Sequence, residues 1–184
     1  MTRDQAWEIL CEHVKSDSLR KHCLSVEASM RHYAEMNGED VEKWGNVGLL
    51  HDFDYELFPE VPDHTRKGAP ILRERGLDEE SVEAILSHAT WNQDEYPLDT
   101  PLRKTLFAVD ELSGFIVAVA LVRPERLGGM KPKSVKKKLK ALNFAAAVSR
   151  DDIHKGAELL GLGLDEHIAN CIEALQKRAD LLQL

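Results

Sequence analysis

The stretch Val47-Gly-Leu-Leu-His-Asp52 joins an apolar run to a polar pair, His51 and Asp52. The run reads as a buried helical segment, and burying an imidazole and a carboxylate costs free energy unless they are paired or bind a metal. Adjacent helical residues point about 100 degrees apart, so both side chains can reach one ion only in a groove between helices. The other ligands of such an ion must therefore come from elsewhere in the chain.

Helical periodicity continues outward from this stretch through most of the sequence, and strand-like alternation is scarce. Turn-forming residues such as Asn37-Gly38 and Gly128-Gly129 separate the helical segments. We therefore expect an all-α fold. The predicted helices cover residues 4–15, 18–36, 40–54, 64–75, 78–90, 100–121, 133–142, 151–160 and 164–182.

The composition is that of a globular protein, with 43% hydrophobic and 30% charged residues in 184. The length suits one domain, and we predict a single domain over residues 1–184. The first residues show no basic region followed by an apolar run, and the longest apolar stretch, Phe115 to Val122, is too short to span a bilayer. We expect a cytoplasmic protein without a membrane partner.

Two further polar residues lie in apolar helical contexts. His22 lies in Lys21-His-Cys-Leu-Ser-Val-Glu-Ala28, and Asp110 lies in Leu106-Phe-Ala-Val-Asp-Glu-Leu-Ser-Gly114. The order of an isolated His, a His-Asp pair and a distant Asp resembles the HD superfamily of metal-dependent phosphohydrolases, and in particular a bacterial subgroup of HD-domain hydrolases. The resemblance extends over about residues 18–120.

The resemblance implies an HD-type bundle of about five core helices, with a helical extension over about residues 130–184. It also implies a divalent metal held by His22, His51, Asp52 and Asp110. Such nitrogen and oxygen ligands suit Mn, Fe, Co, Ni, Zn or Mg. The implied reaction is attack of metal-activated water on a small phosphorylated substrate, with a nucleotide as one candidate, and Asp52 orients the ion and the water.

His64 and His88 resemble additional histidines of some HD proteins. The binuclear branch, which includes the HD-GYP enzymes, has two consecutive histidines near the position of His88, whereas this sequence has one. Two alternatives stay open. His64 and His88 can hold a second ion with Asp52 as a bridging ligand, or they can remain metal-free and contact the substrate phosphate as acid catalyst and hydrogen-bond donor. We favour the second alternative slightly.

Cationic and aromatic residues near these histidines are candidates for substrate contacts. Arg66 and Lys67 follow His64, and cations there would stabilise charge developing on the phosphoryl group. We assign Lys67 a catalytic role as well, on the family resemblance. Trp91 follows His88 in a polar loop and is a candidate for stacking on a base or sugar.

The cluster Lys131–Lys140 is the strongest local excess of positive charge in a chain of net charge −8. Lys133 and Lys137 are candidates for holding a polyphosphate or nucleotide tail. The alternative is a solvated helix face, because Val135, Leu139 and Leu142 recur at helical spacing opposite the lysines. The acidic balance and the lack of interleaved aromatic residues argue against a nucleic-acid partner.

A second class of function stays open beside the enzyme. The single histidine at position 88 would also suit a metal-containing domain that senses a nucleotide or a phosphorylated metabolite without turnover. Four other histidines lack a ligand-like context and are expected to be solvated or helix-terminal, and Asp54 and Glu56 are expected to face water. These histidines are His13, His32, His154 and His167.

Overall fold

The computed structural model describes residues 1–184 and is all-helical, with no strand. The predicted all-α fold class is confirmed. No helix is both long and apolar enough to cross a membrane. The helices are α1 (Arg3–His13), α2 (Asp17–Asn37), α3 (Val41–Leu50), α4 (Asp63–Arg66), α5 (Gly68–Glu74), α6 (Glu79–His88), the 3-10 helix η1 (Thr90–Asn92), α7 (Pro101–Leu121), α8 (Pro132–Leu139), α9 (Arg150–Leu159), α10 (Leu164–Gln176) and α11 (Ala179–Leu182).

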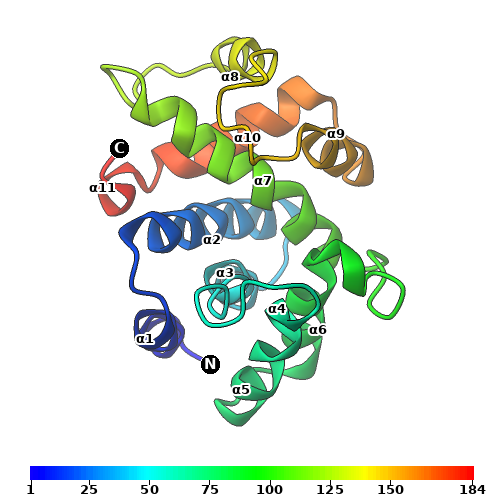
Figure 1. The fold of residues 1–184 in the computed structure, drawn as a ribbon. Coiled ribbons are helices and arrows are strands. Elements are labelled where there is room, and N and C mark those ends of the chain that lie inside the picture. Colours follow the sequence, from blue (N-terminus) through cyan, green and yellow to red (C-terminus); the bar gives the residue numbers. More distant parts are fainter.

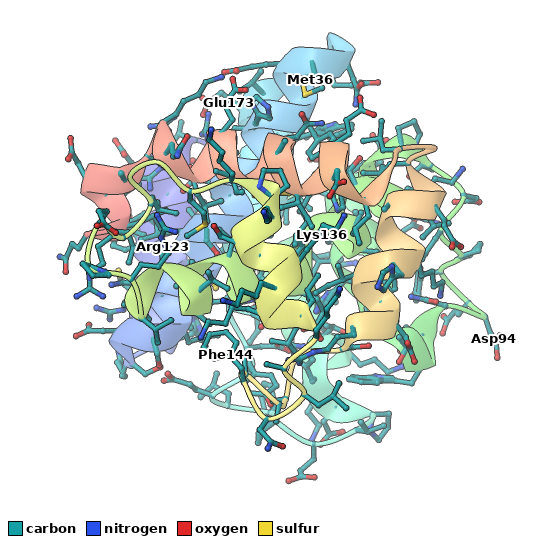
Figure 2. All side chains as sticks on the ribbon, turned by 90° about the horizontal axis from the view of Figure 1, so that it is seen from above. Met36, Asp94, Arg123, Lys136, Phe144 and Glu173 are labelled. Carbon is teal, nitrogen blue, oxygen red and sulfur yellow. The ribbon has the colours of Figure 1, made fainter.

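The two longest helices, α2 and α7, pack against each other in the middle of the molecule (Figure 1). Helix α3 packs on α2, and α6 packs on both α3 and α7. The carboxy-terminal helices α8, α9 and α10 lie on the side of α7 away from α3 (Figure 1). Seen from above, α8 lies over α7 and α10, with Lys136 on its upper face (Figure 2). We call the space between α2, α3, α6 and α7 the groove. The carboxy-terminal ends of α3 and α6 meet there, and the ring centroids of His51 and His88 lie 5.1 Å apart.

Capping side chains set where several helices begin. The side chains of Ser16, Asp40 and Asp78 each accept a hydrogen bond from the backbone N–H three residues further along the chain. These bonds satisfy N–H groups that have no partner within the helix. The starts of α2, α3 and α6 are therefore determined locally by the sequence.

Two predicted helices differ clearly from the structure in their carboxy-terminal parts. The helix predicted over residues 40–54 ends at Leu50, and the chain continues in turns as far as Leu57. The helix predicted over residues 164–182 divides into α10 and α11. The first change matters most, because it lets His51 and Asp52 turn into the groove instead of diverging along a helix surface.

The helix predicted over residues 64–75 is interrupted at its beginning. Thr65 has a φ of 65°, which is rare for a residue other than glycine, and together with the extended His64 it interrupts the helical backbone inside α4. The buried Asp54 holds this backbone, because its Oδ2 accepts a hydrogen bond of 2.9 Å from the Thr65 N–H and its Oδ1 contacts His64 Nδ1 at 2.9 Å. The periodicity of the sequence carries no sign of this long-range constraint.

Helices α2 and α3 approach closely at Gly48. A Cβ atom at this position would lie 2.8 Å from Met30 Cγ and 3.0 Å from both Glu27 N and Val26 O. The absence of a side chain at Gly48 therefore permits the backbone contact that sets α3 against α2. The same contact fixes the distance between His22 on α2 and His51 after α3.

Buried polar contacts join α2 to α7 and α10. Tyr33 Oη lies 2.6 Å from His167 Nδ1, and His167 Nε2 lies 2.9 Å from the carbonyl oxygen of Ala108. His167 is completely buried, and His32 is buried as well. The expectation that they are solvated or helix-terminal is wrong for His32, which lies inside α2. His167 is helix-terminal, in the first turn of α10, but it is not solvated, because α10 packs on α2 and α7.

We expect Gly48→Ala to lower the free energy of unfolding by about 1–3 kcal/mol, since the added methyl group forces α3 away from the α2 backbone. Urea denaturation followed by circular dichroism measures this change. Gly163→Ala is the control, because no atom lies within 4 Å of a Cβ at that position and its backbone does not need glycine. Equal stability of Gly48→Ala and the unsubstituted protein would contradict the close approach.

Candidate metal centre

The four predicted metal ligands lie together in the groove between α2, α3 and α7. His22 lies in the second turn of α2, His51 and Asp52 directly follow α3, and Asp110 lies in the middle of α7. His22 Nε2 lies 3.1 Å from both His51 Nε2 and Asp110 Oδ1, and His51 Nε2 lies 3.5 Å from Asp110 Oδ1. We call these four residues the His/Asp cluster. The ligand atoms of His22, His51 and Asp110 lie close enough together to share one ion, and Asp52 lies beside them.

Asp52 also faces the two additional histidines. Its Oδ2 lies 3.7 Å from His22 Nε2 and 3.6 Å from His51 Nε2. Its Oδ1 lies 3.2 Å from His64 Nε2 and 3.4 Å from His88 Nε2. The carboxylate thus stands between two pairs of imidazoles, and the ligand atoms of His51, Asp52 and His88 also lie close enough together for an ion.

Outer contacts orient three of these imidazoles. His51 Nδ1 lies 2.8 Å from the Gly48 carbonyl oxygen, His88 Nδ1 lies 2.6 Å from the Ile85 carbonyl oxygen, and His64 Nδ1 contacts Asp54. An acceptor at Nδ1 keeps a proton there and leaves Nε2 free to bind a cation. Since each Nε2 points to Asp52, this donor set fits a divalent metal.

Asp54 is one of the residues at the site that sequence reasoning missed. Its side chain is fully buried and contacts His64, whereas we expected it to face water. The turns after α3 carry it inward, and a helix through residue 54 would not. Nothing in the local pattern distinguishes Asp54 from a solvated acidic residue.

Charges within the groove shift the pKa values of the histidines. Burial acts to lower the pKa of His51, but the carboxylates of Asp52 and Asp110 outweigh it and raise the pKa to about 9. Burial is likewise outweighed at His64, where Asp52 and Asp54 raise the pKa to about 9. Burial alone would raise the pKa of Asp110, but His51 and His22 hold it well below its ordinary value. Without a metal, protons bound to the imidazoles compensate the negative charge of the carboxylates. A bound cation would displace those protons.

A cleft of about 220 Å³ opens beside the His/Asp cluster and is lined by His64, His88 and Asp110. Three aromatic residues, Tyr55, Trp91 and Phe107, form much of its wall, and the carboxylates of Glu111 and Asp152 complete it. Trp91, which we predicted to contact the substrate, lies in the wall of this cleft. Its ring centroid is 6.0 Å from that of His64. Neither Arg nor Lys lines the cleft.

Glu111 is the carboxylate of this cleft whose pKa is shifted upward. Burial, with the neighbouring charge of Asp110, raises the pKa of Glu111 to about 7. The contrast with Asp110 arises because Asp110 faces imidazoles, whereas Glu111 faces the remaining acidic residues. We did not single out Glu111 in the sequence, where it reads as an ordinary helical glutamate.

Arg66 and Lys67 are not directed into the cleft. Arg66 Nε donates a hydrogen bond of 2.7 Å to Asn92 Oδ1, and a terminal nitrogen lies 3.0 Å from Glu95. Lys67 Nζ lies 2.6 Å from Asp63, and its side chain is 53% exposed. The predicted contacts of these cations with a phosphate are not formed in this arrangement, because neighbouring carboxylates hold both side chains outside.

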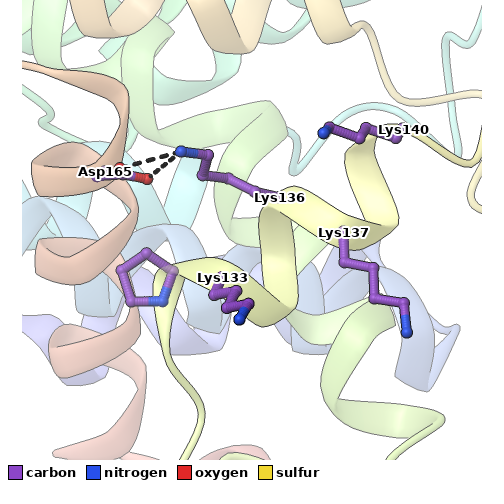
Figure 3. A pocket seen from close by; sticks show the side chains of 6 residues that line it. Lys133, Lys136, Lys137, Lys140 and Asp165 are labelled. Carbon is purple, nitrogen blue, oxygen red and sulfur yellow. Dashed lines mark hydrogen bonds and ion pairs between the residues drawn. The ribbon is translucent and has the colours of Figure 1, made fainter.

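Lys133 and Lys137, which we predicted to hold a polyphosphate or nucleotide tail, do not line the cleft beside the His/Asp cluster. With Lys136 and Lys140 they line a separate hollow of about 540 Å³ on α8, where Lys136 Nζ pairs with Asp165 at 2.8 Å (Figure 3). This hollow shares no lining residue with the cleft, and α8 lies on the side of α7 away from α3. The structure therefore does not bring the lysine cluster to the His/Asp cluster.

The raised pKa values predict a pH dependence of the metal-free protein. A folded-state pKa of about 9, above the ordinary 6.5, adds stability that is complete below about pH 6.5 and is lost as the pH rises through about 9. We expect the free energy of unfolding of EDTA-treated protein to fall over this range, by roughly 3 kcal/mol for one such group. Urea denaturation at a series of pH values measures the fall.

Asp52→Asn is the comparison for this measurement, because a neutral amide no longer favours the protonated rings of His51 and His64. The fall between about pH 6.5 and 9 should be smaller in this variant. An equally large fall in both proteins would assign the pH dependence to groups outside the groove.

Comparison with known proteins agrees with this geometry. The profile of the HD domain family matches residues 19–114, more than half of the chain. Ribonuclease Y of Nitratidesulfovibrio vulgaris is 31% identical over 100 residues in both strain DP4 and strain Hildenborough. The match covers 54% of this chain but 18% of those relatives, so the chain spans less than a fifth of their length. No solved structure matches the chain significantly. The family match and the order His22, His51-Asp52 and Asp110 along α2, α3 and α7 show that the chain belongs to the HD domain family.

Proposed function

We propose that this protein is a metal-dependent phosphohydrolase that acts on a small phosphorylated molecule. The observation that carries the proposal is the position of Asp52, whose two oxygens face two different pairs of imidazoles at 3.2–3.7 Å. A carboxylate in this position can serve one ion or bridge two. The cleft beside it is lined by His64 and His88 and gives a substrate access to these two imidazoles, which face Asp52.

The His/Asp cluster would hold the first ion, and Asp52 with His64 and His88 would hold a second ion or contact the phosphate. A bound divalent cation would lower the pKa of a water molecule and polarise a phosphoryl oxygen, which is the chemistry that attack on a phosphoester requires. His64 is oriented by Asp54 with Nε2 toward Asp52, so in the protonated form it can donate a proton to the leaving oxygen. Asp52 would orient the attacking water.

The size of the cleft favours a small organic group. About 220 Å³ lies below the roughly 300–1,000 Å³ typical of pockets for drug-sized ligands. A phosphate with a short substituent fits this volume better than the nucleotide we considered from the sequence. Because the name Ribonuclease Y denotes action on RNA, a short RNA belongs in the substrate panel beside small esters.

The second candidate function is a sensor that binds metal and a phosphorylated ligand without turnover. It is favoured by the small number of protein ligands beyond the His/Asp cluster, where only His64 and His88 join the shared Asp52. Thermal stabilisation by a phosphate ester without release of phosphate would support the sensor. Release of phosphate in a metal-dependent manner would support the enzyme.

We expect Asp52→Ala to lose both bound metal and phosphatase activity, because this substitution removes the carboxylate that both imidazole pairs face. Elemental analysis of the purified protein, followed by a phosphate-release screen with the metal found, measures both properties. Asp94→Ala is the control, since Asp94 is exposed at the edge of the molecule (Figure 2). Normal activity of Asp52→Ala, or failure of the unsubstituted protein to take up Mn, Co, Ni or Zn, would overturn the proposed function.

We expect Asp54→Asn to reduce activity or metal affinity by roughly 10–100-fold, the range found when an outer hydrogen-bond partner of a metal-site histidine is lost. The amide can no longer accept two charge-assisted hydrogen bonds, so His64 loses its fixed orientation. Titration with Mn²⁺ and steady-state kinetics measure the effect. Asp63→Asn is the matched control, because Asp63 pairs with Lys67 outside the cleft. Equal losses in both variants would show that Asp54 has no special role.

A further inference from the structure

The wall of the cleft beyond the His/Asp cluster has an unusual lining for an enzyme of phosphate esters. It combines three aromatic rings, of Tyr55, Trp91 and Phe107, with the carboxylates of Glu111 and Asp152. Bound metal would compensate the charge of Asp52 and Asp110, which belong to the His/Asp cluster, but it would not compensate Asp152 or Glu111, which is partly ionised because its pKa is about 7. The part of the cleft that receives the organic group is therefore aromatic and acidic.

No arginine or lysine side chain is part of this wall. Arg66 is held by Asn92 and Glu95, and Lys67 is held by Asp63. Lys155 Nζ lies 4.7 Å from the centroid of the Phe107 ring, but Lys155 does not line the cleft. A second phosphate or a carboxylate on the organic group would therefore meet like charge without a compensating partner.

An ammonium group has favourable partners in the same place. A cation within about 6 Å of an aromatic ring centroid is attracted to the ring face, and nearby carboxylates add a Coulombic attraction. The rings of Tyr55 and Trp91 flank His64, with centroids 5.2 Å and 6.0 Å from that of the imidazole. A substituent one or two bonds from a phosphate held at His64 would reach these rings.

We propose, on the basis of the proposed function, that the substrate is a phosphate ester of a small amino alcohol, whose ammonium group binds among Tyr55, Trp91, Glu111 and Asp152. In the reaction water attacks phosphorus, the ester P–O bond breaks, and the amino alcohol leaves with a proton on its oxygen while inorganic phosphate is released. No oxidant or further co-reactant is needed. The volume of about 220 Å³ limits the alcohol to a few non-hydrogen atoms.

The test compares esters of similar shape and different charge. Phosphocholine and phosphoethanolamine carry a cation, 3,3-dimethylbutyl phosphate is the neutral isostere of phosphocholine, and phosphoglycolate carries an anion. With the metal-loaded protein we expect kcat/KM for phosphocholine or phosphoethanolamine to exceed that for the neutral ester by at least about 10-fold, with phosphoglycolate the poorest. Calorimetric titration of the same esters gives the binding preference without requiring turnover.

Neighbouring aspartates on α9 provide a matched pair of variants. Asp152 lines the cleft, whereas Asp151 is exposed beside it in the first turn of the same helix. Asp152→Asn should raise KM for the cationic esters several-fold with little change in kcat, because a binding contact distant from the reacting atoms is lost. Asp151→Asn should leave both parameters unchanged, and circular dichroism checks that both variants fold.

The outcomes separate this inference from the proposed function. Release of phosphate with no preference for the cationic esters, or with preference for phosphoglycolate, would overturn the inference and leave the proposed function intact. A cation preference in binding without phosphate release from any ester would retain the inference and replace the enzyme by a sensor. Absence of both binding and turnover with all four esters would overturn both.

Discussion

The Asp52 carboxylate, shared between two pairs of imidazoles, is the constraint on which the rest of the site depends. Its two oxygens serve His22 and His51 on one side and His64 and His88 on the other. A partly buried carboxylate surrounded by ring nitrogens is stable only if cations or protons are present. In the absence of metal, the carboxylates raise the pKa values of His51 and His64, so that these histidines hold the compensating protons.

The same requirement explains where the backbone departs from regular helix. His51 and Asp52 can both face the groove because α3 ends at Leu50. The following turns bury Asp54, which fixes His64 and holds Thr65 at a positive φ. Backbone conformations of this kind cost free energy and persist where the surrounding contacts determine them. The irregular segment between α3 and α5 is therefore part of the site and not merely a connection.

The sequence predicts the parts of this protein that depend on local pattern. Apolar spacing identifies the helices, and the order of His22, His51-Asp52 and Asp110 identifies the cluster that the structure brings together. The break at Thr65 and the burial of Asp54 depend on contacts between residues ten and eleven positions apart, which periodicity does not encode. The hydrogen-bond partner of Arg66 is also distant in the sequence, since its Nε donates to Oδ1 of Asn92, 26 residues further along the chain.

In the proposed phosphohydrolase, the acidic character of the cleft would give the metal a second role beyond activating water. A phosphate carries negative charge, and the cleft presents Asp110, Glu111 and Asp152 with no Arg or Lys in its lining. Uncompensated like charges in a partly buried site repel more strongly than in water, because the effective dielectric constant is lower. Phosphate can therefore enter favourably only when cations occupy the His/Asp cluster or when His51 and His64 are protonated. For the proposed phosphohydrolase, the binding of substrate and the binding of metal would therefore be linked by electrostatics.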